Sequence, residues 1–215
     1  LGKEAVRNVY YLRYANPVLE RLFKNTLIHH VEITASETVG LQGRAGYFDE
    51  RGTLRDYMQS HMLAMGALLN MRLREGGESF RDGRLNALEQ FYLPPATNLD
   101  EIILQEQYGP SAGGKAIGYS QEEGVSEGSR TNTYIAMKLM TRISRWEGVP
   151  FYFRSGKSLK ERETRISIQF QETHPVGKGS YPNRLDIILQ GEAGMRLHLQ
   201  TKIGGTEPSF RPLVM

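Results

Sequence analysis

The helix predicted over residues 53–74 constrains the fold of this chain more than any other segment. Apolar residues recur at helical spacing from Leu54 onward. After His61 they cover the helix nearly all round, as Met62, Leu63, Met65, Leu68 and Leu69. A helix with so little polar surface cannot lie open to solvent on most of its sides, so other elements of the chain must pack around it.

One of the five histidines of the chain lies inside this apolar stripe. Tyr57 and Met58 precede His61 at helical spacing, so the imidazole belongs to the buried side of the helix rather than to the polar side. A buried titratable group often marks a functional site, but a core histidine hydrogen-bonded to a neighbour gives the same pattern. Spacing alone leaves both interpretations open.

Length and composition are those of an ordinary globular protein. The chain has 215 residues, of which 39% are hydrophobic and 24% charged, enough to bury one sizeable core. Its 27 basic and 24 acidic residues are dispersed, without the basic stripe and stacking aromatics of nucleic-acid surfaces. We therefore expect no nucleic-acid partner.

No segment of the sequence approaches the length of a membrane span, and the first residues carry charges where a signal peptide is apolar. We expect no membrane association. The absence of cysteine excludes disulfides and thiolate metal sites and agrees with a cytoplasmic location. We predict no metal site.

Helical patterns and strand patterns occupy different parts of the chain. Besides the long helix, helical periodicity predicts helices over 3–14, 84–93 and 133–145. Alternation and turn residues predict strands over 27–36, 99–108, 151–154, 165–171, 184–190 and 195–202, the last two joined as a hairpin by residues 191–194. Residues 109–130, rich in glycine, serine and acid, are predicted to form an exposed loop. This arrangement is typical of an α+β fold, which we predict as a large, mostly antiparallel sheet with helices packed on one face.

The sequence contains no Gly-x-Gly-x-x-Gly turn after a predicted strand. Such a turn lets a backbone approach a pyrophosphate at a helix N-terminus. The residues therefore predict no dinucleotide-binding βαβ unit in this chain.

Residues 46–64, GYFDERGTLRDYMQSHMLA, resemble the histidine-bearing helix of glucose-6-phosphate dehydrogenases, which typically reads GYFDxxGxxRDxxQNHxxQ. The resemblance continues in RYANP at 13–17, TASE at 34–37, GRAG at 43–46, RWEGVPF at 145–151 and FRSGKSL at 153–159. Several long motifs in register are more specific than any single short pattern. The resemblance covers nearly the whole chain and corresponds to the C-terminal, substrate-binding domain of that family.

The resemblance implies an oxidoreductase that converts D-glucose 6-phosphate to 6-phosphoglucono-1,5-lactone with hydride transfer to NADP, the first step of the oxidative pentose phosphate pathway. In such an enzyme His61 is the general base that takes the proton of the C1 hydroxyl. An imidazole suits this role, since its ordinary pKa of about 6.5 lies close to neutral pH. The alternative of a core histidine is the less favoured one once the motif is considered.

The resemblance also implies substrate contacts for Lys3, Glu37, Asp56, Lys157, Arg162 and Gln190. Carboxylates such as Glu37 and Asp56 suit sugar hydroxyls, because each offers two charged acceptor oxygens. Lys157 and Arg162 follow the turn at Ser155 and Gly156, where cations can approach a phosphate. The structural alternatives are an ion pair for Asp56, a solvated strand end for Glu37, a solvated charged run for Arg162 and an outward-facing strand residue for Gln190.

The first residues, Leu1-Gly2-Lys3, match the last half of a family motif, Asp-His-Tyr-Leu-Gly-Lys, that lies at the end of a preceding dinucleotide-binding domain. By resemblance, the aspartate of that motif orients the catalytic histidine, and NADP is bound mainly by that domain. We therefore expect residues 1–215 to be a C-terminal domain truncated at both ends, inactive in isolation, and we assign it no cofactor-binding residue. The rival interpretation is a non-catalytic phosphosugar-binding or assembly module.

Two departures from the family pattern concern polar side chains. The asparagine that commonly precedes the catalytic histidine is Ser60 here, which removes an amide group but leaves the base. Animal members hold a second, structural NADP with basic residues; Arg154 matches one of these, but Glu163, Ser167 and His198 replace others. We expect no structural NADP.

The closely spaced strands at the end of the chain are followed by no helix that would cover them. Along 195–202, Met195 and Leu197 alternate with Arg196 and His198, so one face is apolar and the other polar. Members of the family dimerise through this sheet, and we expect a two-fold homodimer formed by it. The alternative is a monomer with a solvated polar face.

Overall fold

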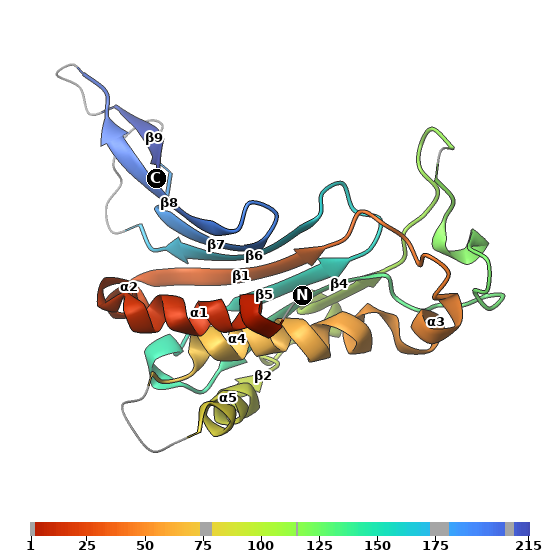
Figure 1. Ribbon diagram of the computed structural model, residues 1–215, viewed down its shortest axis with the longest axis horizontal. Coiled ribbons are helices and arrows are strands. Elements are labelled where there is room, and N and C mark those ends of the chain that lie inside the picture. The colour runs from red at the N-terminus through yellow and green to blue at the C-terminus, as the bar shows by residue number, and fades with distance from the viewer. Residues whose placement is uncertain (1–2, 74–78, 115, 173–180, 205–208) are drawn as a thin grey trace.

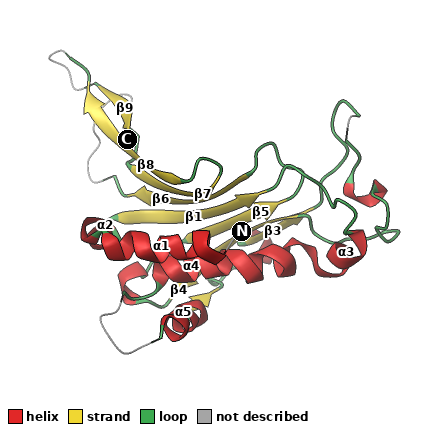
Figure 2. Ribbon diagram, in the orientation of Figure 1, coloured by secondary structure: helices red, strands yellow, loops and turns green. Residues whose placement is uncertain are grey.

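The described residues form a sheet of nine strands. Helices pack on one face of this sheet, as Figures 1 and 2 show. The computed structural model describes residues 3–73, 79–114, 116–172, 181–204 and 209–215, with the side chains of 3–5 excluded. The predicted α+β class and the mostly antiparallel sheet with helices on one face are confirmed.

The strands are β1 (Ile28–Ser36), β2 (Phe91–Tyr92), β3 (Ile103–Glu106), β4 (Tyr134–Thr141), β5 (Phe151–Gly156), β6 (Glu163–Phe170), β7 (Arg184–Gln190), β8 (Gly194–Lys202) and β9 (Phe210–Val214). Their order in the sheet is β2-β4-β5-β1-β6-β7-β8-β9, and β3 pairs with another part of β4. Among the pairings between described residues, β1 with β5 is parallel and the others are antiparallel.

The helical elements are α1 (Lys3–Ala15), α2 (Pro17–Leu22), α3 (Ala45–Thr53), the π-helical segment η1 (Leu54–Met62), α4 (Leu63–Asn70) and α5 (Phe80–Glu89). Short 3₁₀ turns lie at η2 (Leu99–Glu101), η3 (Tyr119–Gln121) and η4 (Ser144–Trp146). The segment η1 and helix α4 together follow the predicted long helix to Asn70 and contact the centre of the sheet at β1 and β5, while α1 and α5 pack against α4. The requirement that this apolar helix be covered is met by a sheet on one side and by helices on the others.

The core lies between the sheet and the long helix. Met58, Met62 and Met65 are buried there against the inward side chains of the central strands, among them Ile33 and Phe153. A smaller apolar cluster formed by Leu41, Ala45, Phe48 and Tyr119 packs beside α3. Burial of an apolar side chain contributes about 1.5–3 kcal/mol, so these contacts hold the helix to the sheet.

Arg13 is a charged residue inside this core and is fully buried. Its guanidinium donates to Glu20 at 2.8 Å and to the Leu68 carbonyl at 2.7 Å, and Glu20 also binds Arg145. Because a buried cation without partners is costly, this network fixes α1 and α2 to α4 and to the turn before β5.

The structure corrects the predicted helix over 133–145, which is strand β4 with the turn η4. Helix-forming residues such as Met137 and Lys138 gave a helical pattern, but Ile135, Leu139 and Thr141 repeat with a period of two and are buried. Pairing with β3 and β5 on either side outweighs the local preference.

Smaller corrections concern element boundaries. The helix expected over 84–93 is α5, which ends at Glu89, and Phe91 and Tyr92 pair with β4 instead. The strand expected over 99–108 is limited to β3, because residues 99–101 form a 3₁₀ turn. The predicted alternation in β1 is interrupted by a register shift between Ile28 and His30, so Ile28 and Val31 are both buried. Helix α3, in a glycine-rich stretch, and strand β9 were not predicted.

Helix α4 lies so close to the sheet that Gly66 has no room for a side chain. A Cβ atom at Gly66 would lie 2.9 Å from Cζ of Phe153, which is fully buried. We expect Gly66→Ala to lower the free energy of unfolding by about 1–3 kcal/mol, because overpacking outweighs the gain in helix propensity. Gly46→Ala is the matched control, since a Cβ there meets nothing within 4 Å in helix α3. Urea denaturation of both variants measures this, and equal stability of the two would contradict the tight packing.

Candidate functional site

The parallel pair β1 and β5 brings two predicted substrate residues to one edge of the sheet. Glu37 follows the last residue of β1 and Lys157 follows the last residue of β5. The backbone N–H of Glu37 donates to the Gly156 carbonyl at 3.0 Å, and Lys157 Nζ donates to Glu37 Oε2 at 2.6 Å. Each residue was predicted separately, and the structure places them in one ion pair.

The charged side chain of Lys157 is buried between Glu37 and the ring of Phe48. Its side chain is only 6% exposed, and Nζ lies 5.2 Å from the centroid of the Phe48 ring. An ammonium group has three N–H donors, and Glu37 uses one of them. A cation that is shielded from water in this way binds an anion more strongly than an exposed lysine does.

Asp56 and His61 lie on the π-helical segment η1. Residues five apart are one turn apart in a π-helix, whereas in an α-helix they point in different directions. The α-helical periodicity assumed for this segment is therefore wrong, and the wider turn brings the Asp56 carboxylate to the same side as His61. Among the ion pairs formed by described residues, none involves Asp56.

The imidazole of His61 is partly buried. Burial lowers the pKa of His61 below its ordinary value, and the negative charge of Asp56 acts in the opposite direction. The imidazole is therefore neutral at neutral pH and able to accept a proton.

Gln190 and Arg162 form a second part of the site beside β6. With the Gln190 amide oriented so that its oxygen accepts from Arg162 at 2.9 and 3.0 Å, its nitrogen donates to Thr164 at 3.1 Å. Thr164 is fully buried and pairs with Gln190 across β6 and β7. Arg162 is exposed, but its guanidinium is held by Gln190 rather than left in solvent.

Lys3 is the first residue of α1, and its side chain lies outside the described part of the chain. Ser60, which replaces the usual asparagine, donates its hydroxyl to the backbone carbonyl of Asp56 at 2.5 Å.

Three residues that the sequence did not point to support these side chains. Tyr57 packs its ring against His61. Asn132 binds the start of η1, where its carbonyl accepts from the Thr53 N–H at 3.0 Å and its Oδ1 from the Leu54 N–H at 3.3 Å. Gly52, with φ of 64°, lets the chain turn here, because a Cβ would lie 3.1 Å from Asn132 Oδ1. Only the spacing of Tyr57 and His61 was visible in the sequence.

Asp49 fastens the loop between β3 and β4 to helix α3. Its carboxylate accepts from the Tyr119 hydroxyl at 2.5 Å, from the Ser126 N–H at 3.2 Å and from the Ser129 hydroxyl. Burial opposes the charge of Asp49, but these hydrogen bonds hold its pKa well below the ordinary range. Burial and the Asp49 charge in turn raise the pKa of Tyr119 to about 12.

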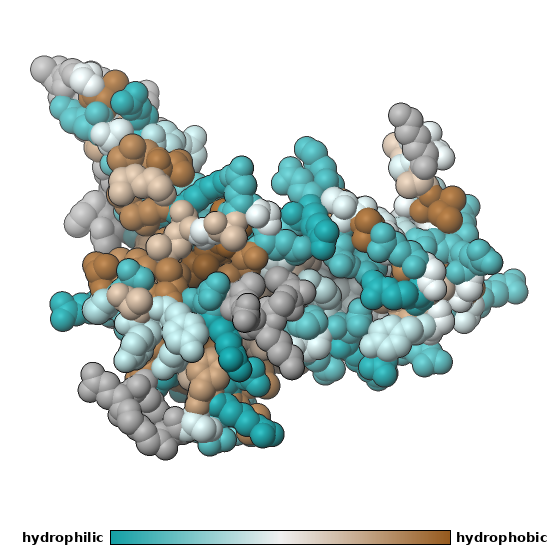
Figure 3. Space-filling view, in the orientation of Figure 1, coloured by the Kyte–Doolittle hydropathy of each residue, from teal (hydrophilic) through white to brown (hydrophobic). Residues whose placement is uncertain are grey.

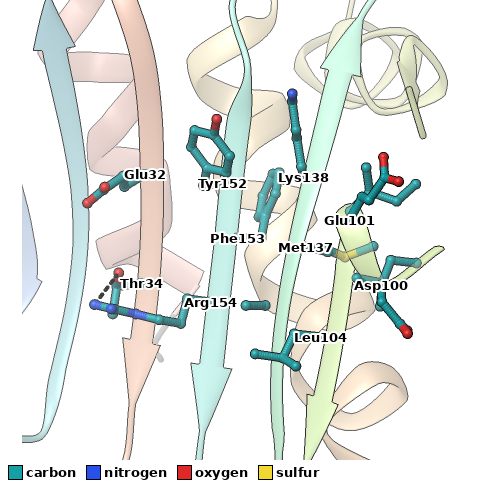
Figure 4. A pocket seen from close by; sticks show the side chains of 13 residues that line it. Glu32, Thr34, Asp100, Glu101, Leu104, Met137, Lys138, Tyr152, Phe153 and Arg154 are labelled. Atoms are coloured by element: carbon teal, nitrogen blue, oxygen red, sulfur yellow. Dashed lines mark hydrogen bonds between the residues drawn. The ribbon is translucent and has the colours of Figure 1, made fainter. Parts of the chain in front are cut away.

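A groove on the opposite face of the sheet does not contain the predicted base or substrate residues. It is lined by Glu32 and Thr34 of β1, by Tyr152 and Arg154 of β5, and by side chains of η2, β3 and β4, as Figure 4 shows. Its volume of about 260 Å³ is below the range of roughly 300–1,000 Å³ for pockets of drug-sized ligands. Arg154 turns toward Thr34 and donates to its hydroxyl at 3.4 Å.

Comparison with known proteins gives one consistent result. Residues 10–215 match the family described as "Glucose-6-phosphate dehydrogenase, C-terminal domain". The glucose-6-phosphate 1-dehydrogenase of Mycolicibacterium smegmatis is 37% identical over 221 residues, which cover 99% of this chain and 45% of that protein. The corresponding protein of Bacillus subtilis is 36% identical over 223 residues, with the same coverage. The chain thus spans less than half the length of these relatives.

Solved structures agree with the sequence comparison. A glucose-6-phosphate dehydrogenase in complex with its substrate glucose-6-phosphate superposes with a TM-score of 0.86 at 32% identity, over 100% of this chain and 44% of that one. Glucose-6-phosphate 1-dehydrogenase from Mycobacterium avium gives a TM-score of 0.81 at 26% identity, over 98% of this chain and 44% of that one. None of the helices in the described part of the chain is both long enough and apolar enough to cross a membrane.

The lowered pKa of Asp49 predicts a pH-dependent contribution to stability. Above the unfolded-state pKa of about 4 the contribution is complete, and it is lost as the pH falls through that value toward the lower pKa of the folded state. We expect Asp49→Asn to lower the free energy of unfolding at pH 7 by about 1–3 kcal/mol, with the difference from the unaltered chain shrinking below pH 4. Denaturation at pH 7, 4 and 3 measures it, with the exposed Asp100→Asn as control. A difference that does not vary with pH would show that the charge of Asp49 is not involved.

Proposed function

This chain belongs to the glucose-6-phosphate dehydrogenase family as its C-terminal domain, and we propose that it supplies the general base and most of the sugar-phosphate-binding groups of a glucose-6-phosphate 1-dehydrogenase. The observation that carries the proposal is the arrangement around Tyr57. Its ring contacts His61, and its hydroxyl lies within the electrostatic reach of Glu37, Arg162 and Asp56. This arrangement supports a shared site for the predicted base and the predicted substrate groups.

His61 acts as the general base in this proposal. The neutral imidazole takes the proton of the C1 hydroxyl while C1 loses a hydride and becomes the lactone carbonyl. The imidazolium that forms is stabilised by the negative charge of Asp56, one π-helical turn away. The aspartate of the neighbouring domain, which the family resemblance implies, would add a second carboxylate.

The charged groups at the sheet edge suit the two ends of a sugar phosphate. Lys157 and Arg162 offer N–H donors to the phosphate, and Glu37 and Asp56 offer carboxylate oxygens to the sugar hydroxyls. The shielding of Lys157 favours an anionic ligand over water. We assign Lys3 to the same substrate, at the start of α1.

NADP is the hydride acceptor in the proposed reaction, but the described residues do not fit it. The parallel pair β1 and β5 is not linked by a single crossover helix with a glycine-rich turn, the arrangement that cradles a pyrophosphate. We propose that a separate dinucleotide-binding domain holds NADP, as the length of the relatives suggests.

We also propose that the open face of the sheet holds no second NADP. Glu163, Ser167 and His198 occupy the positions at which animal members of the family carry basic residues. Glu163 pairs with Arg165 at 3.4 Å. Ser167 and His198 both bind the carboxylate of Asp186, at 2.6 and 2.8 Å. Asp186 is only 3% exposed. A buried carboxylate at this place repels a phosphate, and its basic neighbours are already occupied.

A substitution of the base separates catalysis from binding. In a full-length protein that contains this domain, we expect His61→Asn to lower kcat by a factor of about 10²–10⁴ and to leave the affinity for glucose 6-phosphate nearly unchanged. We expect Lys157→Ala to weaken substrate binding as well as turnover, because it removes a shielded cation. Steady-state kinetics with NADP, and calorimetric titration with glucose 6-phosphate, measure both effects.

His29→Asn is the matched control, because His29 is an exposed histidine at the other end of β1. Normal kcat in His61→Asn would remove His61 as the base. Binding of glucose 6-phosphate without any turnover in the unaltered full-length protein would favour a binding module instead of an enzyme.

We propose that the protein forms a two-fold homodimer through the open face and outer strands of the sheet. Helices of the described residues leave this face uncovered, as Figure 2 shows, and β9 is the outermost of the described strands on that side of the sheet. Met195, Leu213 and Val214 on the outer strands are exposed, and Figure 3 shows hydrophobic surface over the arm formed by β8 and β9. Exposed apolar residues beside an open edge favour a partner surface.

Charge reversal tests this interface. Arg196 lies on β8 and pairs with Glu192 of the preceding turn at 2.8 Å. We expect the full-length protein to be dimeric at micromolar concentration and Arg196→Glu combined with His198→Glu to shift it toward monomers, since like charges would meet their own copies across the axis. Sedimentation equilibrium measures this, with Arg44→Glu near helix α3 as control. A monomer in the unaltered protein, or a dimer insensitive to the double change, argues against this interface.

A further inference from the structure

We propose that Tyr57 is a positioning residue that couples the general base to the groups that bind the sugar phosphate. Its ring sets the orientation of the His61 imidazole, and its hydroxyl fixes Thr164 and, through Thr164, Gln190 and Arg162. This inference rests on the proposed function, since it concerns how that site is assembled. The motif that carries the family resemblance leaves the Tyr57 position unspecified, so this role does not follow from the resemblance.

The ring contact with His61 is direct. The centroids of the two rings are 5.3 Å apart with an interplanar angle of 61°, an edge-to-face arrangement. Such pairs are favourable beyond the area they bury, and they restrict the rotation of both rings. The rest of the Tyr57 side chain packs against the main apolar core, so the ring has a fixed support.

On its other side, the hydroxyl of Tyr57 lies next to a chain of hydrogen bonds formed by Thr164, Gln190 and Arg162. It lies beside the hydroxyl of Thr164, which acts on the pKa of Tyr57 and is fully buried in β6. Thr164 contacts the Gln190 amide at 3.1 Å, and the amide oxygen accepts from Arg162 at 2.9 Å. The chain runs from the buried Thr164 to the exposed Arg162, and each hydrogen bond restricts the next side chain, so loss of the Tyr57 hydroxyl loosens the side chains beyond it.

The charges around the hydroxyl keep it as a phenol. Burial and the carboxylate of Glu37 raise the pKa of Tyr57, while Thr164 and Arg162 act in the opposite direction. Tyr57 therefore stays neutral at neutral pH, and its hydroxyl remains able to donate or accept a hydrogen bond beside Thr164 while a substrate enters beside Glu37. One side chain thus contacts the base and lies within electrostatic reach of Arg162 and Glu37.

Two substitutions separate the roles of the ring and the hydroxyl. In the full-length protein, we expect Tyr57→Phe to raise KM for glucose 6-phosphate about three- to tenfold while kcat stays within about twofold, because the polar contact of the hydroxyl with Thr164 is lost and the ring remains. We expect Tyr57→Leu to lower kcat by about tenfold or more, because the imidazole loses its support. We therefore expect kcat to be near the unaltered value in Tyr57→Phe and reduced in Tyr57→Leu.

Tyr10→Leu is the control for a loss of core packing, since Tyr10 of α1 also packs against the main core but contacts Phe80 rather than the site. We expect kcat and KM within about twofold of the unaltered values in this variant. Equal kinetic effects in Tyr10→Leu and Tyr57→Leu, or unchanged kcat and KM in both Tyr57 variants, would overturn the proposal.

A binding measurement keeps this test apart from the test of the reaction. Calorimetric titration of the full-length protein with glucose 6-phosphate needs no turnover, and we expect Tyr57→Phe to weaken the Kd about three- to tenfold. If the unaltered protein binds the sugar phosphate but does not oxidise it, the proposed reaction fails while weaker binding in Tyr57→Phe still supports the link through Thr164. Unchanged affinity in Tyr57→Phe overturns that link whatever the activity.

Discussion

The parallel pairing of β1 with β5 is the constraint on which the rest of the site depends. In a parallel pair the carboxyl ends of both strands lie at the same edge, so Glu37 and Lys157 leave the sheet side by side. An antiparallel arrangement of the same strands would separate these two residues by roughly 20 Å, the length of six residues at about 3.3 Å each. The ion pair, its shielding by Phe48 and the neighbouring helix segment all follow from this one pairing.

The π-helical segment is the second requirement, and it depends on contacts from outside the helix. A π-helix is less favourable than an α-helix, so it persists only where surrounding structure holds it. Here Asn132 binds the first N–H groups of the segment, Gly52 provides the turn before it, and the buried Met58 and Met62 anchor it to the sheet. As a result of this π-helical geometry, Asp56 and His61 lie on one side of the helix.

The two faces of the sheet carry different chemistry. The helix face contains the candidate site, where Lys157 and Arg162 retain donors for a ligand. The open face contains a closed network in which Asp186 is satisfied by Ser167, His198 and Arg184. Because that network neutralises itself, it offers little attraction to a charged small molecule and is better suited to a surface that another protein subunit covers.

Local sequence determined much of this protein, because periodicity depends only on neighbouring residues. It predicted the long apolar helix, the strand at residues 27–36, the hairpin of β7 and β8 and the α+β class, and the motifs pointed to His61 and to Glu37 and Lys157 as candidates. It assigned β4 to a helix, since strand formation there depends on pairing with β3 and β5. Tertiary structure alone decided three features: the ion pair of Glu37 with Lys157, 120 positions apart in the sequence, the π-helical turn held by Asn132, and the contact of Tyr57 with Thr164. Each of them depends on side chains that only the folded sheet brings together.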